Sequence, residues 1–392
     1  MIYSITASKD ATIYEKVQEG IYSSSINTGI DEVLNIDKVV SSSLGSGPWN
    51  SRILIQFDIP NSVHSGSDSL DTFKNADGTQ FTPPTSSLKL YAIDKSTNHD
   101  HTDSLTIRTL MVSQSWIRGN GRKSNKPITH NPGCSWKYTN GSAAATQWSD
   151  EYGIIRSGAS THSIAAISQV AKTYVQQTNN YDYQVDVTEL VSYMTNSVGT
   201  YGVNRVENNG FLICKERADE LSAYQKGNLA FFSTNTHTIY QPRLEFKWDD
   251  SNFATGSLSE LDTTDASSVF LYLKNNRGNY KYGEKVKFRI QGREKYPVKT
   301  YGNTSANLSI KFLPSGSAFY SIKDLKTGES ILPYDDNFTK LSCDSTGNYF
   351  EMFTSNLSPE RYYQIEIKLK ASGSASDIIG YYPIKDIFKV VR

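Results

Sequence analysis

The chain has little cysteine, no run of like charges and no long apolar segment. Its 392 residues include three cysteines, Cys134, Cys214 and Cys343, an odd number spaced too widely for a disulfide framework or a CxxC metal motif. The 40 Lys and Arg residues equal the 40 Asp and Glu residues, so no overall positive charge attracts nucleic acid or anionic lipid. A membrane span needs about 20 consecutive apolar residues. We therefore expect neither nucleic-acid binding nor a membrane span.

The first ten residues, MIYSITASKD, contain neither the basic segment nor the apolar core of a secretory signal peptide. Together with the unpaired cysteines, this predicts a protein made in a reducing cytoplasm without a conventional export signal.

Aromatic residues are abundant, and they favour β-structure. They make up 12% of the chain, through 25 Tyr and 16 Phe among others, and such residues suit pleated, half-buried strands. The length is too great for one ordinary domain. We therefore expect an all-β protein of two or three domains.

Period-two alternation predicts the strands of the first part of the chain. In residues 52–59 the apolar side chains of Ile53, Ile55 and Phe57 fall on one face, while Arg52 and Gln56 fall on the other. Residues 87–93 and 243–248 alternate in the same way. Each segment is predicted to be a sandwich strand with one buried face.

Two helices are predicted between these strands. Residues 186–194 could begin with Asp186 as the cap and Glu189 as its capping-box partner, with Leu190, Val191 and Met194 on the apolar side. Residues 164–175 have a looser helical spacing. The stretches 61–85 and 118–184 are long and polar, and we expect them to form elaborated loops.

A short polar run at residues 248–257 predicts a domain boundary. Beyond it, four alternating segments are predicted strands: residues 270–273, 286–290, 308–312 and 363–369. Their number and spacing are typical of an antiparallel sandwich of immunoglobulin-like size. We thus predict one domain over residues 1–250 and a smaller sandwich over 251–392.

No catalytic motif is evident, so we expect a protein that is not an enzyme. The run from Gly119 to Ser124 resembles a phosphate-binding loop only superficially, and a surface turn is favoured. The loop 99–103 is rich in His and Asp but has no distant fourth metal ligand. A structural Ca²⁺ could be held by Asp10, Asp31 and Asp37, although their spacing matches no EF-hand; no other cofactor is expected.

Tryptophans lie in the loop-rich regions and permit two interpretations. Trp116, Trp136 and Trp148 could stack on sugar rings and form a glycan-binding site. Alternatively, they anchor the long loops to the sandwich, which is the favoured interpretation because large aromatic side chains fix irregular chain efficiently. Cys214 lies in an apolar strand-like run and is expected to be a buried side chain.

Several motifs of residues 1–250 occur in the order found in DNRLRE domains. They are Asp10-Ala-Thr-Ile-Tyr14, Asn27-Thr-Gly29, Val33–Ile36, Ser51–Asp58, Ser87–Tyr91, Ser115-Trp116 with Gly119 and Gly121, Val185–Val191, Asn209–Ile213, and Phe231-Phe-Ser233 leading to Gln241–Phe246. The chain therefore resembles this family over most of its first 250 residues. The long segments 61–85 and 122–180 depart from the compact family pattern.

The resemblance implies a jelly-roll-like β-sandwich, similar to carbohydrate-binding modules. Such domains accompany secreted polysaccharide-active proteins and also occur in structural proteins of contractile-tailed marine phages. Because no export signal is found, the phage context is favoured.

We therefore expect a virion structural protein of the head, neck, tail or baseplate, assembled in the host cytoplasm and oligomeric in the particle. Its partners would be other virion proteins. The alternative is a carbohydrate-binding module that attaches to host surface glycans. A glycan-degrading depolymerase is a third interpretation.

Overall fold

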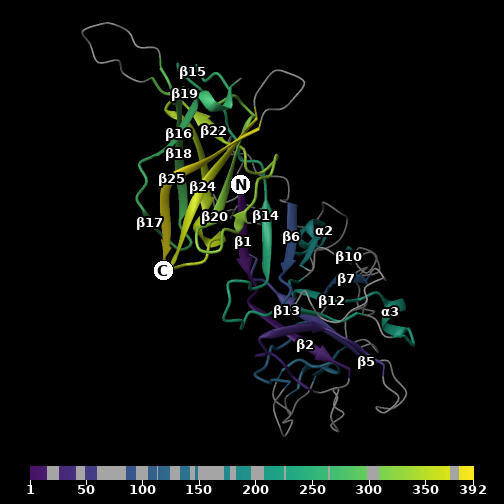
Figure 1. The fold of residues 1–392 in the computed structure, drawn as a ribbon. Helices are drawn as coiled ribbons and strands as arrows, with labels where there is room; N and C mark the ends of the chain where they lie inside the picture. The colour runs from purple at the N-terminus through teal and green to yellow at the C-terminus, as the bar shows by residue number, and fades with distance from the viewer. Residues whose placement is uncertain are drawn as a thin grey trace, which may run out of the picture. The chain divides into compact units, whose positions relative to one another are not determined.

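The computed structural model forms two compact units (Figure 1). Of the described residues, those from Ile5 to Glu245 form the first unit, and Met1–Ser4 with those from Phe246 to Arg392 form the second. The division falls within strands β1 (Ile2–Thr6) and β14 (Arg243–Lys247). The structure describes residues 1–15, 26–40, 49–59, 85–93, 105–112, 114–123, 133–141, 146–148, 172–176, 182–195, 207–224, 227–263, 265–297, 309–370 and 379–392.

Strands dominate both units, which confirms the all-β prediction. The strands of the first unit, besides β1 and β14, are β2 (Lys9–Tyr14), β3 (Val33–Ile36), β4 (Lys38–Val39), β5 (Trp49–Gln56), β6 (Thr85–Leu90), β7 (Leu105–Met111), β8 (Tyr138–Asn140), β9 (Thr146–Gln147), β10 (Lys172–Gln176), β11 (Tyr183–Asp186), β12 (Phe211–Lys215) and β13 (Leu229–Phe232). One sheet has the order β1-β14-β6-β11, and a second has the order β10-β7-β12-β5-β2 with β4 beside β5. Smaller pairs are β13-β3 and β8-β9.

The strand predicted at residues 52–59 is confirmed as β5, but the prediction that one face is exposed is wrong. Arg52 and Leu54 on the second face are buried as well as Ile53 and Ile55 on the first. Leu54 packs with apolar side chains such as Trp116, and Arg52 forms a buried ion pair with Glu220. A partner far away in sequence thus allows a charged side chain to be buried in the strand.

One predicted helix forms and the other does not. Helix α2 (Thr188–Thr195) buries Leu190, Val191 and Met194 as predicted. Its start is bonded to Asp186, whose carboxylate accepts hydrogen bonds from the amide and hydroxyl of Thr188. The helix predicted over 164–175 is wrong at its C-terminal end, because Lys172–Gln176 pairs with β7 as strand β10. Residues 164–171 lie outside the described part. A second short helix, α3 (Arg217–Leu221), follows β12.

The second unit contains two sheets that share one core. Its strands are β15 (Ser259–Glu260), β16 (Val269–Lys274), β17 (Asn279–Lys281), β18 (Lys285–Glu294), β19 (Lys311–Phe312), β20 (Ala318–Asp324), β21 (Ser330–Leu332), β22 (Ser342–Asp344), β23 (Gly347–Phe353), β24 (Arg361–Lys370) and β25 (Ile379–Val391). One sheet has the order β15-β19-β18-β23-β22 with β16 beside β18, and the other β17-β25-β24-β20-β21. The rings of Tyr320 and Phe350, one from each sheet, stack with centroids 4.0 Å apart. The strands predicted at residues 270–273, 286–290 and 363–369 are confirmed as parts of β16, β18 and β24, whereas the strand predicted at 308–312 is found in the described residues only at Lys311–Phe312, as β19.

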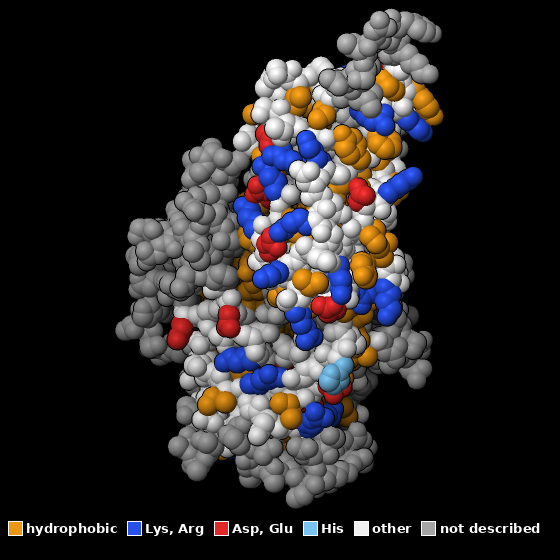
Figure 2. Space-filling view, turned by 90° about the vertical axis from the view of Figure 1, so that its left-hand side faces the viewer, with side chains coloured by type: hydrophobic (Ala, Val, Ile, Leu, Met, Phe, Trp, Pro, Cys, Tyr) orange, Lys and Arg blue, Asp and Glu red, His pale blue; other side chains and the backbone are white. Residues whose placement is uncertain are grey.

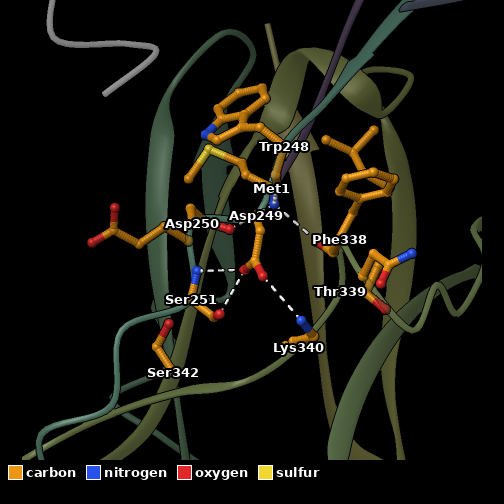
Figure 3. Close-up of polar contacts among 12 residues, drawn as sticks. Met1, Trp248, Asp249, Asp250, Ser251, Phe338, Thr339, Lys340 and Ser342 are labelled. Carbon is orange, nitrogen blue, oxygen red and sulfur yellow. Dashed lines mark hydrogen bonds and ion pairs between the residues drawn. The ribbon is translucent and has the colours of Figure 1, made fainter. Parts of the chain in front are cut away.

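The first four residues of the chain pack into the second unit. The Met1 ammonium donates to the carbonyls of Trp248 and Phe338 and to the carboxylate of Asp250, and neighbouring Asp249 binds Lys340 (Figure 3). Burial lowers the pKa of this ammonium and raises that of Asp250. The ion pair therefore offsets only part of the unfavourable burial of the two charges.

Asn356, in the 3₁₀ helix η5 (Thr354–Asn356), holds the same segment further along. Its fully buried side chain accepts from the Ser4 amide at 2.7 Å and the Ser4 hydroxyl at 2.8 Å, and donates to the Ile2 carbonyl at 2.6 Å. The Ser4 amide and the Ile2 carbonyl thus both have the Asn356 side chain as a hydrogen-bond partner.

We predict that Asn356→Ala lowers the free energy of unfolding by about 3 kcal/mol, because buried backbone groups lose their partners. The measurement is urea unfolding of the full chain. The control is Asn337→Ala, which truncates an exposed side chain of the same unit and should change little. Equal effects of the two substitutions would contradict this assignment.

Candidate functional site

Two motifs of the family resemblance meet at Asn27 in the first unit, namely Asn27-Thr-Gly29 and the run that contains Gly119 and Gly121. Its amide nitrogen donates to the carbonyls of Arg118 and Cys134 at 2.7 and 2.9 Å. Its amide oxygen accepts from the backbone amides of Gly121 and Gly29 at 2.8 and 3.2 Å. An asparagine side chain has two donor hydrogens and two acceptor positions. All four take part in hydrogen bonds here, and they join the segments at Gly29, at Arg118 to Gly121 and at Cys134. We call this arrangement the Asn27 hub.

The glycines of the motifs are required by close backbone approach at this hub. A Cβ on Gly121 would lie 2.2 Å from the Asn27 carbonyl oxygen, and one on Gly29 would lie 2.1 Å from the Arg118 carbonyl oxygen. Since real Cβ atoms do not approach so closely, neither position has room for a side chain. The run from Gly119 is therefore a turn packed against Asn27.

Further motif residues are engaged around the hub. The hydroxyl of Thr28 donates to the Thr12 carbonyl and accepts from the Thr12 amide. The carboxylate of Asp10 accepts from the amide and hydroxyl of Thr234 at 2.7 and 2.8 Å. Burial nevertheless raises the pKa of Asp10 to about 6. These side chains bond to the fold itself.

The three tryptophans proposed for glycan binding occupy two kinds of environment. Trp116 and Trp148 are 2% and 5% exposed, and their indole nitrogens donate to the carbonyls of Asn209 and Ser135. Trp136 is partly buried, with the Arg52 guanidinium 4.4 Å from its ring centroid. Two of these rings therefore leave no face open to a sugar, and their positions are those of side chains that anchor loops.

The acidic residues suggested for calcium do not gather into a site. The oxygens of Asp10 face Thr234, whereas Asp31 accepts from the Lys123 amide. Across the described ranges, no group of three or more His, Cys, Asp or Glu side chains is placed to hold a metal ion. The His-rich loop 99–103 lies outside the described residues.

We predict that Asn27→Asp lowers the free energy of unfolding of the first unit by about 3 kcal/mol. The substitution preserves shape but sets a carboxylate oxygen against the carbonyls of Arg118 and Cys134, which cannot donate. Tryptophan fluorescence in urea is the measurement. The control, Asn35→Asp, faces the Tyr14 hydroxyl, which can donate to a carboxylate; if both variants lost the same stability, the hub would have no special role.

A second buried polar cluster surrounds Arg52 of strand β5. Arg52 donates two hydrogen bonds to the Glu220 carboxylate, at 2.8 and 2.7 Å. Nearby, the Lys38 ammonium donates to the carbonyls of Asp219 and Ser222 at the end of α3. Lys215 is 2% exposed, and its amine has no hydrogen-bond partner among the residues that the structure describes.

Lys215 is the most perturbed lysine of the described chain. Its pKa is lowered to about 7, chiefly by burial and also by the charge of Lys38, while the carboxylates of Asp37, Asp219 and Glu220 oppose the shift. The amine is therefore held largely without its charge above neutral pH.

We predict that Lys215 makes the stability of the first unit depend on pH. Between about 7 and the ordinary pKa of 10.5, the unfolded chain holds a proton at this amine that the folded chain lacks. Stability should therefore rise with pH, by up to about 1.4 kcal/mol per pH unit from this group alone.

Urea unfolding from pH 6 to 10 tests this, as the difference between the native chain and Lys215→Met. As the pH rises, the free energy of unfolding of the native chain should increase relative to that of Lys215→Met. The control is Lys137→Met, which removes an exposed lysine. A difference that stays constant across this range would contradict the assignment.

The two sheets of the second unit present different outer faces. Tyr362, Tyr381 and Ile387 are 52%, 55% and 43% exposed on β24 and β25; we call this the aromatic face. Cross-strand pairing places Phe270, Tyr272 and Lys274 of β16 opposite Arg293, Gln291 and Arg289 of β18; with Lys285 and Lys287 they form the basic face. Figure 2 shows Lys and Arg interspersed with hydrophobic, Asp and Glu side chains on one side of the molecule.

Comparisons with known proteins identify no family. The chain matches no protein-family model and no curated protein. Among solved structures it is similar to a DUF4785 family protein from Legionella pneumophila (8% identity, TM-score 0.18), a Parabacteroides merdae β-glucuronidase (8%, 0.16) and E. coli α-2-macroglobulin (9%, 0.18). The alignments cover 99%, 99% and 98% of this chain but 66%, 35% and 26% of those chains, so it spans less than two thirds of each. Such low TM-scores carry no argument about fold or function.

No helix in the described ranges is long and apolar enough to cross a membrane.

Proposed function

We propose that this chain is a non-enzymatic structural component of a tailed-phage virion, in the head, neck, tail or baseplate. The first unit would be a jelly-roll-like sandwich of the DNRLRE kind, and the second a smaller immunoglobulin-like sandwich. Its partners would be other virion proteins and further copies of itself in the particle.

The aromatic face is the observation that carries this proposal. Exposed tyrosines supply large contact areas at low cost in side-chain entropy, and they are enriched at protein interfaces. Tyr362 and Tyr381 lie opposite Lys389 and Lys368, so polar groups border the aromatic rings. An interface commonly combines such an apolar centre with a polar rim.

The motifs of the first unit support the proposal in a second way. Asn27, Thr28, Asp10 and Trp116 are bonded within the fold, as expected where such motifs maintain a rigid frame. A rigid sandwich suits a particle component because it presents loops and strand edges in fixed positions.

The alternative of a carbohydrate-binding module gains no support from its proposed tryptophans. Trp116 and Trp148 would have to leave the core before a sugar could reach them. Glycan binding by this chain would therefore need another surface.

We predict that particles purified from the phage that encodes this chain contain it at a fixed ratio to the other virion proteins. Quantitative mass spectrometry of density-purified particles is the measurement, with the unpurified lysate as reference. A chain that stays in the soluble fraction would contradict the proposal.

The aromatic face is tested in the same assay. Tyr362→Asp with Tyr381→Asp should reduce incorporation strongly, because buried carboxylates oppose an apolar contact. Tyr224→Asp, at an exposed tyrosine of the first unit, is the control. Incorporation that is equal in both variants would exclude the aromatic face as the contact.

A further inference from the structure

The basic face of the second unit follows the alternation of side chains along β18, which is regular from Lys285 to Ile290. Outward positions of β18 carry Lys285, Lys287, Arg289 and Arg293, while Val286, Phe288 and Ile290 between them enter the core. Pairing with β23 sets Lys287 opposite Glu351 and Arg289 opposite Tyr349. Because the inward side chains fix the strand, the outward cations are held in a row.

This row has more positive charge than its neighbours neutralise. Five cations, Lys274, Lys285, Lys287, Arg289 and Arg293, face two carboxylates, Asp344 and Glu351, which leaves 5 − 2 = +3. Asp344 receives two hydrogen bonds from Arg289, at 2.9 and 2.8 Å, and Glu351 pairs with Lys285 at 2.9 Å.

The remaining two cations are not neutralised in this way. Lys274 and Arg293 have no carboxylate within ion-pair distance in the described part of the chain. The excess charge therefore lies toward the β16 side of the face, and a partner there must be anionic.

The aromatic rings of this face are covered by its own cations. The Lys287 ammonium lies 3.6 Å from the ring centroid of Tyr349, and the Arg293 guanidinium lies 4.4 Å from that of Phe270. Binding of single-stranded nucleic acid relies on open aromatic faces for base stacking. These rings instead hold the cations in place, which favours a partner recognised by its charge.

The length of the row suits an extended polymer. Outward side chains of a strand recur about every 6.7 Å, and the row from Lys285 to Arg293 is about 27 Å long. Gln291 stands between the cations, but it is 2% exposed and its amide is bonded to Tyr272 and Thr346. A linear chain with recurring carboxylates can meet cations that are spaced along such a row.

We propose that the basic face, β16–β18–β23, binds an acidic polysaccharide through its uronate carboxylates. Lys274 and Arg293 supply the unneutralised charge that binds these carboxylates. This site differs from the tryptophans of the first unit, and it goes beyond the structural role, on which it does not depend.

Binding of polygalacturonate to the purified full chain at low salt tests the proposal by biolayer interferometry. Lys274→Gln with Arg293→Gln should raise Kd at least about tenfold, because two charge-assisted contacts are lost. The matched control, Lys326→Gln with Lys385→Gln, removes the same charge from exposed lysines outside the basic face. It should leave Kd within about twofold of the native value.

Two further probes separate the partners. Neutral dextran should not bind, and oligo(dT) should bind more weakly than polygalacturonate. The proposal is overturned if polygalacturonate does not bind, if both double variants weaken it equally, or if oligo(dT) binds more tightly through the same two residues. Unchanged thermal unfolding of both variants shows that the fold is intact. Since the assay uses no particle, its result is independent of whether the chain is found in virions.

Discussion

The first unit depends on the side chain of Asn27, whose four hydrogen bonds join segments that are about a hundred residues apart. The close approach of Gly29 and Gly121 to neighbouring backbone leaves no room for other residues there. Thr28 extends the same contacts to β2, and Trp116 extends them to Asn209. The motifs that are similar to DNRLRE domains are thus explained by the geometry of packing, and the chemistry of binding has to be sought on other surfaces.

Those surfaces are most distinct in the second unit. Its two sheets share one core, yet their outer faces differ in kind, with exposed rings around Tyr381 and excess positive charge around Lys274 and Arg293. The net charge of zero could not predict this difference, because it sums the charges of all faces, whereas a partner contacts only one of them. A particle component with one face for protein neighbours and another for an acidic glycan would combine the two functions that were weighed as alternatives.

Alternation along the chain was enough to predict β5, β14, β18 and β24, since one inward side chain in two determines a strand. It could not predict that Arg52 is buried, because its partner Glu220 is 168 residues away. The apolar spacing of residues 164–175 predicts a helix, but the pairing of Lys172–Gln176 with β7 overrides that local preference. The sequence pattern alone places Lys285, Lys287 and Arg289 on one side of a strand. Their neutralisation by Asp344 of β22 and Glu351 of β23 could not be predicted, because only the fold brings those carboxylates beside them.

The central claim is that the two outer faces of the second unit have different partners. A density map of the assembled particle tests it most directly, because it shows what lies against each face of this chain. The account predicts that the aromatic face contacts a neighbouring virion protein and that the basic face is open to solvent. A map in which the basic face is buried against another virion protein while Tyr362 and Tyr381 remain exposed would contradict it.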